Sequence, residues 1–116
     1  MATATYKILG QGVPTTTTST TLYSVPNTST NTVISTVTIC NTTTSPAGAY
    51  LYLVKGGSTA ATTNALVYNN TIAGNTTVTL TLGLTLSNTA SVVDFLVGGT
   101  GTSGALTFTV SGSEIA

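Results

Sequence analysis

Apolar and polar residues alternate with a period of two along much of this chain. The clearest case is the run from Thr76 to Leu86, TTVTLTLGLTL, in which Val78 and the four leucines that follow it fall on one side. The threonines and Gly83 fall on the other side. A period of two is that of a β-strand with one buried and one solvated face. Threonine suits the solvated face because its β-branched side chain favours a pleated surface and its hydroxyl tolerates water.

The same reasoning predicts further strands. Ala105–Ser111 repeats the alternation, with Leu106, Phe108 and Val110 on one side. Thr32–Asn41 and Ala49–Val54 are denser apolar runs with β-branched and aromatic residues, and we expect them to be central strands. Additional strands are predicted at Leu22–Val25, Ala65–Asn69 and Ser91–Val97.

Clusters of turn-forming residues separate these runs. They lie at Pro26–Asn31, Asn41–Gly48, Gly56–Asn64, Ile72–Asn75, Ser87–Thr89 and Gly98–Gly104. Apolar residues recur nowhere at helical spacing over a helix-length segment. Short strands punctuated this regularly predict an all-β fold with almost no helix: a single antiparallel β-sandwich or jelly-roll-like domain at residues 21–116.

The first twenty residues differ from the rest and predict an extended N-terminal arm or linker. They contain the breakers Gly10, Gly12 and Pro14 and the threonine run 15–18. Such a segment is either a frayed terminus or an arm that docks on a neighbouring molecule. Tyr6, Ile8 and Leu9 favour docking, because a solvated tail has little use for three large apolar side chains. They are also compatible with a short strand.

Composition supports a folded domain and restricts its chemistry. Thirty threonines, eleven serines, twelve glycines and eight asparagines make up 61 of the 116 residues. A polar tract of this kind can be disordered, but 41% of the residues are hydrophobic, which is close to an ordinary globular domain. The chain length fits one domain.

Charge excludes whole classes of partner. The charged side chains are Lys7, Lys55, Asp94 and Glu114, and there is no histidine. Two lysines neutralise too few phosphates for nucleic-acid binding that depends on counterion release. No apolar run approaches the length of a membrane span, and no basic region followed by an apolar stretch opens the chain. We therefore expect no membrane association and no signal peptide.

The scarcity of charged residues and the absence of histidine also argue against an enzyme. A serine nucleophile needs a base, and no histidine is present; Lys55 at a predicted strand end is more simply a solvated edge residue. Cys40 has no His or Arg to lower its pKa and is expected to be a small core residue. Asp94 lies between apolar neighbours and is expected to accept backbone hydrogen bonds or face an interface. One cysteine and two distant acids, Asp94 and Glu114, are too few for a metal site, and no cofactor is predicted.

The near absence of charged residues predicts that this β-protein associates with other molecules. Soluble sandwiches usually protect their open edges with Lys and Glu and keep their net charge away from zero. This chain has a net charge of zero. The simplest explanation is that its edges are covered by copies of itself or by other proteins, through contacts that salt affects little.

Several segments resemble small structural proteins of tailed bacteriophages, especially those of cyanobacterial phages. These segments are Tyr6–Gln11 (YKILGQ), Thr21–Pro26 (TLYSVP), the run ending Ile39-Cys40-Asn41, the strand Thr79–Leu86 (TLTLGLTL), and Gly112–Ile115 (GSEI). The resemblance covers nearly the whole chain and implies a β-sandwich component of the virion, made in the cytoplasm of the host bacterium. It favours a capsid decoration (cement) protein that forms a trimer or dimer and bridges copies of the major capsid protein or other virion proteins. Tyr6, Ile8 and Leu9 would then form the docking arm.

Two alternatives remain open. The same domain could serve in low copy number at the neck, tail or baseplate, which sequence does not distinguish from the head. It could instead be a host-glycan-binding module on a tail fibre, with sugars stacked on Tyr6, Tyr23, Tyr50, Tyr52 and Tyr68. Tyr50 and Tyr52 share one face of a predicted strand, which fits a core or interface role better.

Overall fold

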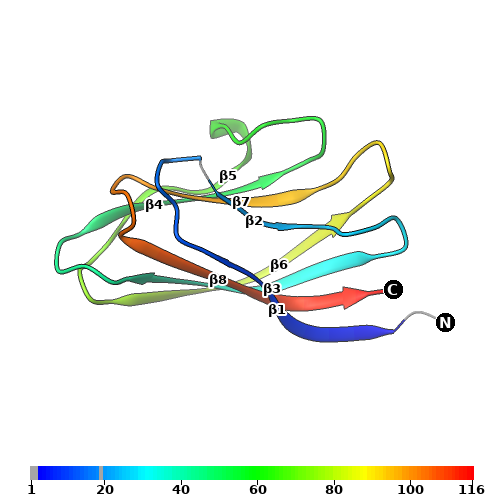
Figure 1. Ribbon diagram of the computed structural model, residues 1–116, viewed down its shortest axis with the longest axis horizontal. Coiled ribbons are helices and arrows are strands. Elements are labelled where there is room, and N and C mark those ends of the chain that lie inside the picture. The colour runs from blue at the N-terminus through cyan, green and yellow to red at the C-terminus, as the bar shows by residue number, and fades with distance from the viewer. Residues whose placement is uncertain (1–2, 19) are drawn as a thin grey trace.

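The computed structural model describes residues 3–18 and 20–116, and these form an antiparallel β-sandwich (Figure 1). Its strands are β1 (Ala4–Gly12), β2 (Thr20–Ser24), β3 (Asn31–Asn41), β4 (Ala47–Val54), β5 (Ala65–Ile72), β6 (Thr77–Ser87), β7 (Phe95–Thr100) and β8 (Leu106–Ile115). Sheet A has the order β1-β8-β3-β6, and sheet B has the order β2-β7-β4-β5. Within the described part of the chain, the only helical element is a single 3-10 turn, Thr62–Asn64. The predicted all-β sandwich is confirmed.

The core lies between the two sheets and is built by strand alternation. On β3, Ile34, Val37 and Ile39 face inward and are fully buried, and on β8 Phe108 and Val110 do the same. β3 lies between β8 and β6, and β4 lies between β7 and β5. Both strands are therefore central, as their dense apolar sequences predicted.

The N-terminal segment contributes a strand to the sandwich. β1 pairs with β8 from Ala4 opposite Ile115 to Gly12 opposite Phe108, with an irregularity between Ile8 and Gly10. The expected boundary after residue 20 falls just inside β2, which begins at Thr20, and nine of the twenty residues of the predicted arm form an edge strand of sheet A. Residues 1, 2 and 19 of that arm lie outside the described residues. Thr3 and Ala116 exchange backbone hydrogen bonds, so the start of β1 and the end of β8 lie side by side (Figure 1).

Strand β7 begins and ends later than the sequence predicted. Gly98 and Gly99, expected to open a loop, are buried in β7, where Gly99 lies opposite Tyr50 of β4. A Cβ atom on Gly99 would lie 1.8 Å from the carbonyl oxygen of Thr17, and one on Gly98 would lie 2.9 Å from Leu22. These glycines allow close packing against the segment before β2 and against β2 itself. The exposed loop begins only at Gly101.

Candidate interaction surface

Asp94 has a structural role in which both carboxylate oxygens are used. Oδ1 accepts a hydrogen bond from the backbone N–H of Gly56 at 3.2 Å, and Oδ2 accepts one from the N–H of Ser87 at 3.1 Å. Asp94 therefore ties the end of β6 to the turn that follows β4. This matches the expectation that it accepts backbone hydrogen bonds.

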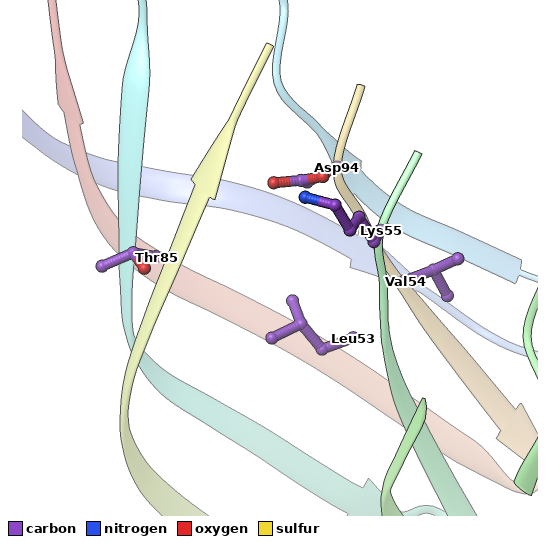
Figure 2. A pocket seen from close by; sticks show the side chains of 5 residues that line it. All are labelled: Leu53, Val54, Lys55, Thr85 and Asp94. Carbon is purple, nitrogen blue, oxygen red and sulfur yellow. The ribbon is translucent and has the colours of Figure 1, made fainter. Parts of the chain in front are cut away.

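A small cavity of about 190 Å³ adjoins this carboxylate. It is lined by Leu53, Val54, Lys55, Thr85 and Asp94, and Figure 2 shows the exposed Lys55 side chain extending toward Asp94. Each carboxylate oxygen of Asp94 accepts a backbone hydrogen bond, so the residue that borders this cavity also holds the neighbouring strand ends together. Within the described ranges, no three His, Cys, Asp or Glu residues cluster as metal ligands would, and no helix is long and apolar enough to cross a membrane.

The other two charged residues, Lys7 of β1 and Glu114 of β8, form an ion pair between neighbouring strands of sheet A. Lys7 Nζ lies 2.5 Å from Glu114 Oε1, and the hydroxyl of Tyr23 donates to Glu114 Oε2 at 2.5 Å. The Tyr23 hydroxyl also lies 2.7 Å from Thr32 Oγ1. This group joins β1, β8 and β3 of sheet A to β2 of sheet B.

The environment of this group shifts two pKa values in opposite directions. The hydrogen bond from Lys7, assisted by the one from Tyr23, holds the pKa of Glu114 below its usual value. Burial, together with the hydrogen bond to Glu114, raises the pKa of Tyr23 from 10.0 to about 12. Glu114 is therefore ionised and Tyr23 neutral at physiological pH, and Lys7 balances the one charge.

An uncharged apolar patch covers one end of the outer face of sheet A. Tyr6 of β1 and Val33 of β3 both lie opposite Ser113 of β8, so all three share a face. That face points away from the core, because the next residue, Glu114, points toward Tyr23 in the other sheet. Alternation places Ile8 and Ile115 on the same outer face. We call Tyr6, Ile8, Val33 and Ile115 the β1 face.

The β1 face exposes its two largest side chains. Tyr6 is 83% exposed and Ile8 is 64% exposed, while Ser113 beneath them is buried with no hydrogen-bond partner for its hydroxyl. Leu9 turns the other way and packs against the core. The structure thus brings together two of the three residues predicted to dock and separates the third. The contributions of Val33 and Ile115 depend on strand register, which alternation alone does not reveal.

Tyrosines gather on the outer face of sheet B. The rings of Tyr50 and Tyr52 stack with centroids 6.4 Å apart, which confirms that they share a face. Tyr68 contacts Tyr50 edge to face at 5.1 Å. Tyr52 is only 2% exposed and Tyr23 only 8%, so neither presents a ring for a sugar to stack on.

Cys40 is not in the core, which corrects the sequence expectation. It is half-buried on the outer face of sheet A, between Thr77 of β6 and Thr107 of β8. Its neighbours Ile39 and Asn41 occupy the inward positions and are fully buried. The sequence did not reveal this alternation, because apolar residues are adjacent to each other at this end of the strand.

No protein-family model matches the sequence, and no curated protein matches it. The fold is similar to part of a protein in the T13 particle of infectious bursal disease virus, with a TM-score of 0.50, 14% sequence identity, and coverage of 99% of this chain and 30% of that one. A structure of the Gx strain of the same virus gives a TM-score of 0.47 and 14% identity over 99% of this chain and 31% of that one. The chain spans less than a third of the length of these viral proteins. At 14% identity, the similarity to the protein of the T13 particle shows a shared fold.

Proposed function

We propose that this protein is a non-enzymatic structural component of a virus particle, and specifically a capsid decoration protein that bridges coat subunits. The observation that carries the proposal is the β1 face, where Tyr6 and Ile8 are exposed on a surface without unpaired charge. An apolar surface of this kind is typical of an interaction site. The proposal is also supported by a fold shared with part of a protein in a virus particle.

The proposed mechanism is mechanical. Tyr6 and Ile8 pack against a coat subunit, and complete burial of a side chain the size of isoleucine contributes roughly 1.5–3 kcal/mol. Lys7 and Glu114 already neutralise each other, so few counterions rearrange on binding. Attachment is therefore expected to survive high salt, as suits a contact made once and kept.

Copy number tests the placement on the head. Quantitative mass spectrometry of purified source particles is expected to give a near-stoichiometric ratio to the major coat protein, on the order of hundreds of copies, because a closed shell repeats each contact by symmetry. Roughly a dozen copies or fewer would instead place the protein at the neck, tail or baseplate. Absence from the particle would overturn the virion proposal.

Substitutions on the β1 face test the docking surface. Tyr6→Ser combined with Ile8→Ser is expected to weaken binding to particles lacking the protein by about tenfold or more, since it removes two exposed apolar anchors. Binding is measured by co-sedimentation, at low and high salt. The matched control is Tyr68→Ser, an exposed tyrosine on the other sheet. Substitution is preferable to deleting the segment, because deletion would remove a whole strand of sheet A. Unchanged binding by the double variant would exclude the β1 face.

A further inference from the structure

Strand β6 is the longest and least protected edge of the sandwich. It runs for 11 residues without a charged residue or proline. The opposite edge of sheet A, β1, carries Lys7 and is irregular after Ile8. In sheet B, β2 has five residues, and β5 contains two irregularities and Asn69 at a φ of 50°. Short strands, bulges and charges are the usual means of preventing edge pairing. Of these, β6 has only one irregularity, opposite Ser35 of β3.

The apolar face of β6 is incompletely covered. Its outward residues are exposed threonines and Gly83, as the alternation predicted, but its inward leucines Leu80, Leu82 and Leu84 are only half-buried. Only Leu86 at the end of the strand is fully buried. On the opposite side of the sandwich, β1 and β2 are linked by the Lys7–Glu114–Tyr23 group, which leaves β6 on the more open side.

We propose that β6 pairs antiparallel with β6 of a second copy, about a two-fold axis through Leu82. The pairing joins the two A sheets into one sheet of eight strands. Each copy supplies the same edge, so the contact is isologous and closes at a dimer. The β1 face lies on the outer surface at the other edge of sheet A and stays accessible. The dimer stands whether or not the protein belongs to a virus particle.

The sequence of β6 is self-complementary about Leu82. Residues equally distant from Leu82 lie opposite each other in the dimer. Four of the five pairs match in kind: Leu80 with Leu84, Thr79 with Thr85, Val78 with Leu86, and Thr77 with Ser87. In the fifth pair, Thr81 meets Gly83. Apolar side chains therefore meet on the inner face, and hydroxyl residues meet on the outer face at every pair except Thr81 with Gly83. The irregularity of β6 at Leu82 and Gly83 lies at the two-fold axis. The regular segments before and after it, Thr77–Thr81 and Leu84–Ser87, are therefore the parts that pair with the second copy.

Charge also favours a second copy as the occupant. A two-fold axis brings any net charge on the strand close to the same net charge on its copy, so an edge strand with a net charge repels itself. None of the four charged residues lies on β6, whereas Lys7 lies on β1. An uncharged strand of alternating Thr and Leu thus fits a copy of itself better than a charged partner.

Paired charges at Thr79 and Thr85 test both the dimer and its register. Thr79 of one copy lies opposite Thr85 of the other, and both side chains are exposed. Light scattering after size exclusion, at on the order of 100 µM protein, is expected to show a dimer for the natural sequence. Thr79→Lys with Thr85→Lys places two like-charge pairs across the axis and is expected to raise the dimer Kd about tenfold or more. Thr79→Glu with Thr85→Glu is expected to do the same.

Mixing the two variants provides the matched control. Each lysine then faces a glutamate, so the mixture is expected to form a heterodimer, detected by native mass spectrometry. Tyr6→Ser with Ile8→Ser is expected to remain dimeric. Three results would overturn the proposal: a natural protein that is monomeric, a Thr79→Lys, Thr85→Lys variant that dimerises normally, or a mixture that forms no heterodimer. These measurements need no particles, so their failure is distinguishable from failure of the virion proposal.

Discussion

Replacing Asn41 by alanine is expected to lower the free energy of unfolding by about 3 kcal/mol. Asn41 ends β3 and is completely buried. Its Nδ2 donates to the carbonyl oxygens of Ser45 and Ile72 at 2.9 and 3.0 Å, and its Oδ1 accepts from the N–H and hydroxyl of Thr43 at 2.9 and 2.7 Å. Alanine removes all four hydrogen bonds and leaves the carbonyl oxygen of the buried Ile72 without this partner. Chemical denaturation followed by circular dichroism measures the change.

Two further variants show whether the hydrogen bonds are the cause. Asn31→Ala, at the exposed start of the same strand, is expected to change stability by less than about 0.5 kcal/mol. Asn41→Asp keeps the shape but replaces the donor with a carboxylate that faces two carbonyl oxygens. Its destabilisation should be smaller at pH 4 than at pH 7, because a protonated carboxyl can donate again. A loss below about 1 kcal/mol for Asn41→Ala would contradict this account.

The natural protein is expected to lose about 2 to 3 kcal/mol of stability relative to Tyr23→Phe as the pH rises from 10 to 12. The pKa of Tyr23 is raised from 10.0 in the unfolded chain to about 12 in the fold. The folded protein therefore holds this proton more tightly. The resulting stabilisation is complete below pH 10 and is lost as the pH approaches 12.

Comparison of the natural protein with Tyr23→Phe isolates the contribution of the Tyr23 hydroxyl. The two proteins share every other side chain, so pH effects that do not involve Tyr23 cancel in the difference. Denaturation at a series of pH values from 8 to about 12 measures it. Below pH 10, Tyr23→Phe is expected to be the less stable protein, because it lacks the hydrogen bond to Glu114. A stability difference that does not change with pH would contradict the raised pKa.

The strands were predictable where alternation is regular. The run around Leu80 and Leu82 identified β6, and the dense apolar runs that contain Val37 and Leu51 identified the two central strands. Alternation reports which residues share a face, because successive side chains point to opposite sides. It does not report how completely a neighbouring sheet covers that face. The leucines of β6 were therefore expected to be buried, although the structure leaves three of them partly exposed.

The candidate surfaces were less predictable, because they depend on pairings between distant residues. Tyr6 and Ile8 were noticed as apolar, but the β1 face also needs Val33 and Ile115, which only strand register places there. Gly98 and Gly99 resemble turn residues in the sequence, yet they are needed for close packing in β7.

The pairing of β1 with β8 determines when the β1 face can form. These strands lie at opposite ends of the described chain, so β1 has no partner in sheet A until β8 has been synthesised. Contacts so distant in sequence form late, because the loop between them must close first. A partly synthesised chain therefore lacks the ordered array of Tyr6, Ile8, Val33 and Ile115. The proposed attachment through this face is therefore restricted to molecules that have completed folding.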